Sequence, residues 1–215
     1  MRAKVSFVFT ISCLLLFSSV VMAKEFTLTD LSAWQVIKGS PTEETADGIT
    51  GILLAPPDRD LDWAVGDYIL FELPEEISSG TVTVDAKIRL NGRDRGLVIT
   101  TMKPLTEESS EWVEHCSHAN AYISADQGQL KYFVGATSGS WHVLSDVNLF
   151  TWIPVRLEVD LDAKLFHFYL DGNYVGSGNF RLPEADSLVA IGFLLYQGTT
   201  PAQSAMVADV VVTIP

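Results

Sequence analysis

The segment around residue 116 brings together side chains that bind zinc or act as nucleophiles. It contains Glu114, His115, Cys116 and His118. Imidazole and thiolate groups are zinc ligands, and a cysteine becomes a nucleophile when a base lies within hydrogen-bond reach. These residues are too close together to complete a metal site alone, and no second pair of ligands stands out in the sequence. We therefore favour a loop with exposed histidines and a half-buried thiol over a metal or catalytic centre.

Alternating acids suggest a second kind of chemistry. Glu158, Asp160 and Asp162 stand at every second position, which places their carboxylates on one face of a strand. Glycoside hydrolases use two carboxylates that flank the scissile bond. Acidic side chains are also mostly exposed in proteins, and we favour the interpretation of a solvated strand face. The sequence contains no Gly-x-Ser-x-Gly elbow, phosphate-binding loop or dinucleotide-binding fingerprint.

The N-terminal segment has the pattern of a secretory signal peptide. Residues 1–4 are basic, residues 5–21 are largely apolar, and Ala23 ends a short stretch suited to cleavage. A membrane anchor is the alternative, because the apolar run is close to the minimum for spanning a bilayer. The polar chain that follows favours cleavage. We expect residues 1–23 to be removed, residues 24–215 to form one domain, and the protein to be exported, either periplasmic or secreted.

The charge balance excludes some partners. Cleavage after Ala23 would remove Arg2 and Lys4 but no acid, so the net charge would change from −13 to −15. An acidic surface repels nucleic acid and anionic membranes. Only Cys116 would remain in the mature chain, so no intramolecular disulfide is available and the core alone must hold the fold. No second apolar run approaches membrane-spanning length.

Short alternating segments predict an all-β domain. Residues 80–90 and 153–160 place apolar side chains at every second position, as half-buried strands do. Asp171-Gly172 between two apolar segments predicts a hairpin with a tight type I′ turn. Similar segments recur along the chain, and we see no linker or internal repeat. This pattern predicts one domain of about a dozen short strands, packed as two sheets.

The C-terminal half resembles a known superfamily. Residues 152–160 have the pattern Trp-x-x-Val-x-Leu-x-Val-Asp, and residues 166–176 carry Asp-Gly followed by Val-Gly. This strand and hairpin resemble the concanavalin A-like lectin/glucanase superfamily and its laminin-G-like domains. Residues 31–37 and 46–49 are similar to its first strand, and residues 208–213 to its closing strand. The resemblance implies a two-sheet antiparallel β-sandwich, the concanavalin A-like jelly roll. It implies no activity, since this fold hosts lectins, hydrolases, lyases and adhesive modules.

Enzymes of this superfamily carry motifs that the sequence lacks. Its hydrolases usually have Glu-x-Asp-x-(x)-Glu, and the nearest match ends in Asp162 instead of glutamate. Its alginate-lyase-like members usually show Arg-x-Glu-x-Arg and Gln-Ile-His, of which only the fragment Arg156-Leu-Glu158 is present. The resemblance therefore favours a module without catalytic activity, and leaves an enzyme with an unfamiliar site as an alternative.

A sugar-binding face is the remaining kind of site. Sugars are bound by flat aromatic rings and by polar groups that reach their hydroxyls. Alternation over residues 120–145 predicts an inner set that includes Tyr132 and Trp141, and an outer set that includes Phe133 and His142. For Trp141 the core is favoured and ligand binding is the alternative. The resemblance implies a concave polar glycan-binding face, for which the candidate residues are Lys87, Arg89, Tyr122, Lys131, Phe133, Trp141 and His142.

A structural Ca²⁺ is a further expectation from the resemblance. Many members bind calcium through an aspartate on the closing strand and oxygen atoms near the first strand. Asp209 matches the first place, and Asp47 lies in the partner region. Hard oxygen ligands suit such a site. The alternative is an ordinary aspartate in an edge strand.

These observations favour a non-catalytic glycan-binding module with a polysaccharide or glycan as partner. The first alternative is a glycoside hydrolase or polysaccharide lyase on the same fold. The second is an adhesive or protein-interaction module, for which a broad apolar patch is expected. The sequence indicates neither the sugar nor an oligomeric state.

Overall fold

The computed structural model describes residues 23–56, 64–92, 97–102, 120–126, 128–135, 139–197 and 203–215. The predicted signal peptide, apart from Ala23, lies outside these residues, as does the segment from Glu114 to His118. One 3-10 turn, η1 (Leu31–Ala33), accompanies the strands. The strands are β1 (Lys24–Leu28), β2 (Gln35–Lys38), β3 (Thr42–Ala46), β4 (Ile49–Leu54), β5 (Ala64–Ile77), β6 (Thr81–Leu90), β7 (Leu97–Met102), β8 (Tyr122–Asp126), β9 (Gln129–Val134), β10 (Ser140–Asp146), β11 (Trp152–Asp160), β12 (Leu165–Leu170), β13 (Asn173–Asn179), β14 (Leu188–Gln197) and β15 (Ala205–Ile214).

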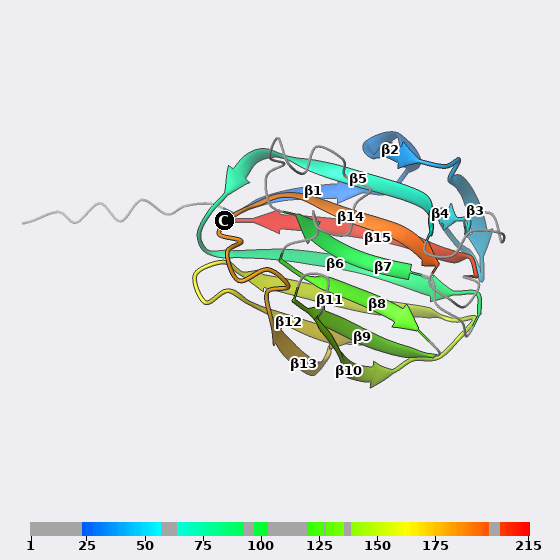
Figure 1. The fold of residues 1–215 in the computed structure, drawn as a ribbon. Coiled ribbons are helices and arrows are strands. Elements are labelled where there is room, and N and C mark those ends of the chain that lie inside the picture. Colours follow the sequence, from blue (N-terminus) through cyan, green and yellow to red (C-terminus); the bar gives the residue numbers. More distant parts are fainter. Residues whose placement is uncertain are drawn as a thin grey trace, which may run out of the picture.

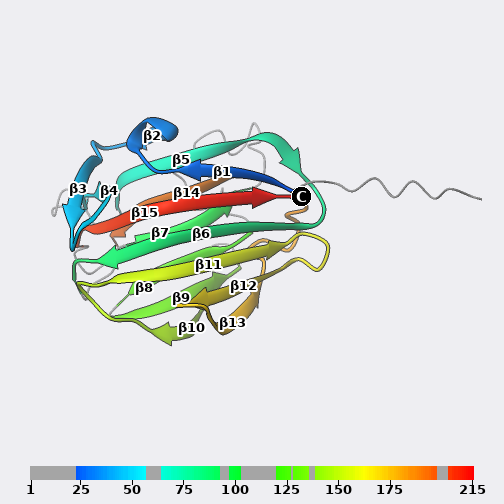
Figure 2. The ribbon, with the colours of Figure 1, turned by 180° about the vertical axis from the view of Figure 1, so that it is seen from behind.

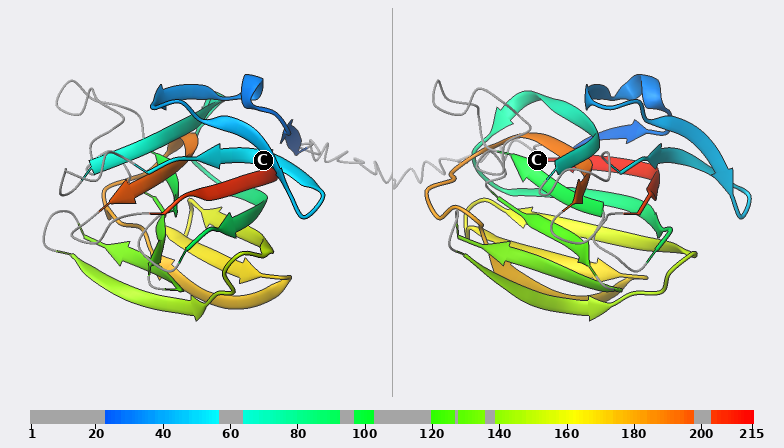
Figure 3. Two further views of the ribbon diagram at one scale, coloured as in Figure 1. Left: turned by 90° about the vertical axis from the view of Figure 1, so that its right-hand side faces the viewer. Right: turned by 45° about the vertical axis from the view of Figure 1, so that its right-hand side comes forward.

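The strands form two antiparallel sheets that pack face to face (Figures 1 and 2). Sheet A has the order β13-β12-β11-β6-β15-β4-β3, with β1 also paired to β15. Sheet B has the order β10-β9-β8-β7-β14-β5-β2. The edge strands β10 and β13 lie at one end of the sandwich, far from β2 and β3 (Figure 3). The predicted two-sheet antiparallel β-sandwich is confirmed.

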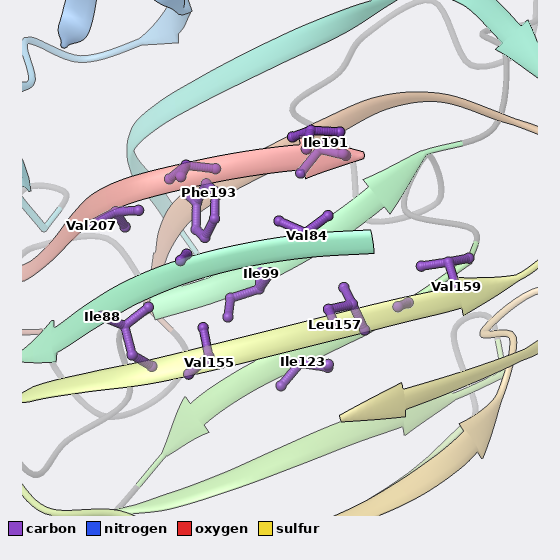
Figure 4. Close-up of a cluster of buried hydrophobic side chains, with 14 of the residues drawn as sticks. Val84, Ile88, Ile99, Ile123, Val155, Leu157, Val159, Ile191, Phe193 and Val207 are labelled. Atoms are coloured by element: carbon purple, nitrogen blue, oxygen red, sulfur yellow. The ribbon is translucent and has the colours of Figure 1, made fainter. Parts of the chain in front are cut away.

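Strict alternation in the sequence becomes a one-sided strand in sheet A. In β6, Val84 and Ile88 point to the core, while Asp85 and the other residues between the apolar positions stay partly exposed. The neighbouring β11 repeats this arrangement. Figure 4 shows their apolar side chains against those of sheet B, including Ile123 and Phe193. Alternation therefore predicted correctly which side of sheet A is buried.

The Asp-Gly hairpin is also confirmed. Leu170 pairs with Asn173, so β12 and β13 are joined by a two-residue loop. Asp171 has φ 47° and Gly172 has φ 74°, the left-handed values that a type I′ turn requires at both central positions. Glycine adopts this conformation without steric cost, which explains its place at the second position.

Sheet B is buried on both of its faces in its central strands. Phe193 of β14 belongs to the core between the sheets, whereas Leu194 belongs to a second apolar cluster on the outer face. The buried members of this second cluster are Val65, Tyr68, Leu70, Val98, Ala190, Leu194 and Tyr196. Burial raises the pKa of Tyr68, so its hydroxyl stays protonated in the folded protein. Within the described ranges, no helix is long and apolar enough to cross a membrane.

Candidate functional site

An aromatic pair lies on the outer face of sheet B, on its two last strands. Trp141 of β10 is paired in register with Phe133 of β9, and their ring centroids lie 5.0 Å apart. The side chain before Phe133, Tyr132, points the other way and meets Phe166 of sheet A edge to face, 5.2 Å between centroids. Phe133 itself packs against the second apolar cluster. The aromatic pair therefore faces away from sheet A.

The next pair of residues on the same face, two positions along each strand, extends this surface. Val143 of β10 pairs with Lys131 of β9, and Trp141 and Val143 are 39% and 58% exposed. We call the four outward residues Lys131, Phe133, Trp141 and Val143 the β9–β10 face. It offers a large exposed indole ring beside the Phe133 ring, with the Lys131 ammonium group two residues further along β9. Stacking surface and a polar donor are the two parts that sugar recognition uses.

Arg181 borders the β9–β10 face. It follows β13, and its guanidinium carbon lies 5.2 Å from the Phe133 ring centroid, within the range of a cation–π contact. Its Nε donates a hydrogen bond to the Gly135 carbonyl at 3.3 Å. The backbone holds it in place, because Gly135 N donates to Arg181 O at 2.9 Å and Arg181 N donates to Asn120 O at 3.1 Å. Arg181 is only 5% exposed, so it supports the aromatic pair rather than projecting into solvent.

Asn120 lies next to Arg181 through this backbone hydrogen bond. Its side chain is fully buried, and across the described part of the chain neither Oδ1 nor Nδ2 has a hydrogen-bond partner. Buried amides are nearly always hydrogen-bonded. Because this amide is fully buried, it belongs to the structural support behind Arg181 and not to the surface that a ligand could touch. Sequence analysis missed Arg181, because a basic residue outside the strands follows no periodic pattern.

The prediction of which β10 side chains face inward and which face outward was wrong. His142, not Trp141, shares a face with Tyr132: the rings stack with centroids 4.9 Å apart and planes 20° apart. The His142 ring also lies 2.9 Å from the Ser140 hydroxyl through Nε2. The reason is that β10 is an edge strand, exposed to partly exposed along its length, with a register shift between Val143 and Ser145. Apolar periodicity says little about such a strand.

Tyr122 lies in β8 and pairs with Thr100 of β7. Its backbone is described, and its side chain lies outside what the structure describes. The register brings β8 directly beside β9, with Ser124 opposite Lys131. Tyr122 is thus on the strand next to the β9–β10 face.

Lys87 and Arg89 lie elsewhere. Both are in β6 of sheet A, so the expectation that they share one polar face with the residues of β8 to β10 was wrong. Sequence periodicity tells which side chains alternate, but not to which sheet a strand belongs. Lys87 Nζ lies 2.8 Å from Asp209, and Arg89 Nε lies 3.4 Å from Asp47. These two basic side chains form ion pairs with carboxylates on the outer surface of sheet A.

The same contacts bear on the calcium expectation. A cation at Asp47 or Asp209 would compete with Arg89 or Lys87 for the carboxylate oxygens. Both aspartates have left-handed φ angles, 52° and 50°. In the described ranges, no group of three or more His, Cys, Asp or Glu side chains clusters to hold a metal ion. Binding of calcium at either aspartate would therefore displace an ion pair.

The alternating acids at the end of β11 and in the turn after it have local structural contacts. Asp160 accepts a hydrogen bond from Ala163 N at 2.8 Å, and Asp162 accepts one from Gly80 N at 3.0 Å. Glu158 accepts a hydrogen bond from the Tyr169 hydroxyl at 3.0 Å. Two of the three thus fix turns, which agrees with the favoured interpretation of a strand face and its flanking turn.

Comparison with known structures identifies the fold. A sialidase matches with a TM-score of 0.60 and 14% identity, over 86% of this chain and 18% of its own. The Emp47p carbohydrate recognition domain matches with a TM-score of 0.55 and 12% identity, over 85% of this chain and 88% of its own. The family 7 alginate lyase A1-II′, in complex with a product, matches with a TM-score of 0.55 and 14% identity, over 78% and 80%.

The chain spans less than one fifth of the length of that sialidase. No protein-family model matches the chain, and no curated protein does. At these identities the structural likeness carries the fold alone. The order of the strands, the two antiparallel sheets and these matches together show that the described residues adopt a concanavalin A-like β-sandwich fold.

Proposed function

We propose that this protein is an exported, non-catalytic glycan-binding module whose sugar site is the β9–β10 face. One observation carries the proposal: Trp141 is exposed on the outer face of sheet B, and the Phe133 ring lies beside it on the neighbouring strand. A pyranose ring packs its apolar side against such an aromatic surface, and a half-exposed tryptophan gains most from being covered. Lys131 on β9 supplies a polar group for hydroxyls.

The similar structures support a sugar as the ligand. One is a carbohydrate recognition domain and another is an alginate lyase bound to a product. They also supply the alternative, because the lyase is an enzyme on this fold. The structural roles of Asp160 and Asp162 favour the binding module. A polysaccharide lyase or glycoside hydrolase, and an adhesive protein-interaction module, are the outcomes against which the proposal is tested.

The experiment is a glycan array combined with a polysaccharide-degradation screen on residues 24–215. We expect binding without release of products. Trp141→Ala is expected to weaken binding at least about fivefold, the effect of losing a central contact residue worth more than about 1 kcal/mol. Phe150→Ala is the matched control, because Phe150 is also an exposed aromatic residue, 56% exposed, but lies outside β10. Product release, or equal binding by Trp141→Ala and wild type, would contradict the proposal.

Export and calcium binding are proposed with it. Expression of the full chain with its leader is expected to yield a protein that begins at Lys24, which mass spectrometry measures directly. If calcium binds at Asp209, then Ca²⁺ raises the unfolding temperature of wild type by mass action and leaves that of Asp209→Asn unchanged. An unprocessed chain would contradict export. Equal unfolding temperatures with Ca²⁺ and with a chelator would contradict the metal site.

A further inference from the structure

We infer that the outer face of sheet A carries a second binding surface, for an uncharged sugar chain, at its β12–β13 end. Three rings gather there. Tyr174 of β13 is 57% exposed, and its ring lies edge to face against Tyr169 of β12, with centroids 5.5 Å apart. His167 of β12 lies 6.2 Å from Tyr174. We call Tyr169, Tyr174 and His167 the tyrosine platform.

The platform faces away from sheet B. Phe166 and Phe168, which alternate with His167 and Tyr169 along β12, are buried in the core between the sheets. The β9–β10 face lies on the outer side of the other sheet, so the two surfaces point in opposite directions (compare β9 and β10 with β12 and β13 in Figures 1 and 2). The platform is therefore a separate surface and not an extension of the β9–β10 face.

A register shift aligns the two tyrosines. Phe168 pairs with Gly176, but the next residue, Tyr169, pairs with Tyr174. Without this shift the residue opposite Tyr169 would be Val175. Bulges re-aim side chains in this way and often lie beside binding sites. Directly opposite residues of an antiparallel pair bring their side chains into contact, so the shift creates the paired rings.

Polar groups that bind sugar hydroxyls flank the rings on β11. Glu158 pairs with His167 and accepts the Tyr169 hydroxyl hydrogen bond at 3.0 Å. Arg156 pairs with Tyr169 and binds Asp85 through two hydrogen bonds, of 2.7 and 2.9 Å. These contacts fix the planar carboxylate and guanidinium groups beside the rings before a ligand arrives. Preorganised groups lose little freedom on binding.

The charges on this face select a neutral ligand. Arg156 is paired with Asp85, Lys87 with Asp209, and Arg89 with Asp47. The whole chain has a net charge of −13, so no excess of positive charge attracts a polyanion. A second copy of this chain is a poorer occupant, since stable homodimer interfaces are depleted of charge at their centre, whereas Arg156 and Asp85 here are 50% and 36% exposed.

The test is affinity electrophoresis of residues 24–215 in native gels that contain barley β-glucan, galactomannan or alginate. We expect at least one neutral polysaccharide to retard the wild type, and Tyr174→Ala to weaken that retardation at least threefold in the apparent Kd. Tyr174→Phe, which keeps the ring, is expected to restore it. Asn179→Ala is the matched control, because Asn179 is also exposed on β13 but pairs with Leu165, outside the tyrosine platform.

Retardation of the Trp141→Ala single variant and of the Trp141→Ala/Tyr174→Ala double variant separates the contributions of the two surfaces. If both bind, Tyr174→Ala lowers the retardation of Trp141→Ala further. If the β9–β10 face binds no sugar, Trp141→Ala behaves as wild type while Tyr174→Ala still loses retardation. The inference is overturned if no neutral polysaccharide retards the wild type, or if Tyr174→Ala matches Asn179→Ala. It is also overturned if sedimentation shows a wild-type dimer that Tyr174→Ala abolishes without changing retardation.

Discussion

The two sheets of this sandwich treat their outer faces differently. In sheet A, β6 buries Val84 and leaves Thr83 and Asp85 partly exposed. In sheet B, β14 buries both Phe193 on the inner face and Leu194 on the outer face. Sheet A is therefore buried on its inner face and solvated on its outer face, whereas the central strands of sheet B are buried on both faces. An exposed aromatic ring lies at the same end of both sheets, Trp141 on β10 and Tyr174 on β13.

Because of this difference, the β9–β10 face has apolar surroundings and the tyrosine platform has polar surroundings. The β9–β10 face continues a buried apolar cluster, because Phe133 packs against its members. The tyrosine platform continues a polar surface of ion pairs on β6 and β11. Changes near the β9–β10 face are therefore expected to affect stability, whereas changes near the platform are expected to affect binding with little loss of stability.

The largest expected effect comes from truncating outward residues of the two central strands. Leu194→Ala removes a buried side chain, 2% exposed, from sheet B, and we expect it to lower the free energy of unfolding by about 2–5 kcal/mol. Thr83→Ala on sheet A is expected to change it by about 0.5 kcal/mol. Urea unfolding followed by tryptophan fluorescence measures both. Similar losses for the two variants would show that the outer faces do not differ as described.

A smaller effect is expected from adding a methyl group inside sheet B. A Cβ at Gly192 would lie 2.9 Å from Cε2 of Tyr68 and 3.3 Å from Cγ2 of Thr100. We expect Gly192→Ala to cost about 1–3 kcal/mol through overpacking. Gly172→Ala is no suitable control because of its left-handed φ, so the comparison is Thr213→Ala on the outer side of sheet A. A Gly192→Ala protein as stable as wild type would mean that this layer is loosely packed.

The same contrast explains what the sequence could predict. Strands with one buried face alternate visibly, so β6, β11 and the Asp-Gly hairpin were predicted correctly. In β14 the segment from Leu188 to Tyr196 is almost continuously apolar, and such a run indicates burial without indicating which face is inner.

The candidate site was harder to predict for a related reason. Lys131, Phe133 and Trp141 were candidates from residue type, but Trp141 was assigned to the inner face because an edge strand has no clear pattern. Lys87 and Arg89 were grouped with them although β6 belongs to the other sheet. Which strands become neighbours depends on contacts between distant segments, and local periodicity does not contain that information.

On sheet A a modest effect is expected from its best-formed ion pair. Arg156 and Asp85 are joined by two hydrogen bonds but remain partly exposed. Exposed pairs contribute about 0.2–1 kcal/mol, and salt screens them. A double-mutant cycle of Arg156→Ala and Asp85→Ala is expected to give a coupling in this range that shrinks in 1 M NaCl. A coupling of several kcal/mol that salt leaves unchanged would mean that the outer face of sheet A is less solvated than the comparison with sheet B implies.

The smallest expected effect is a titration on the tyrosine platform. The hydrogen bond to Glu158 raises the pKa of Tyr169 above its ordinary value, because the carboxylate stabilises the protonated phenol. A raised folded-state pKa means that this contribution to stability is complete below the unfolded pKa of about 10 and is lost as the pH rises through the folded value. The difference in absorbance at alkaline pH between wild type and Tyr169→Phe isolates this group. Glu158→Gln is expected to shift its midpoint downward, toward that of an ordinary tyrosine. An unchanged midpoint would mean that the hydrogen bond does not persist in solution, and the platform would then lack the preorganised carboxylate on which its sugar contacts depend.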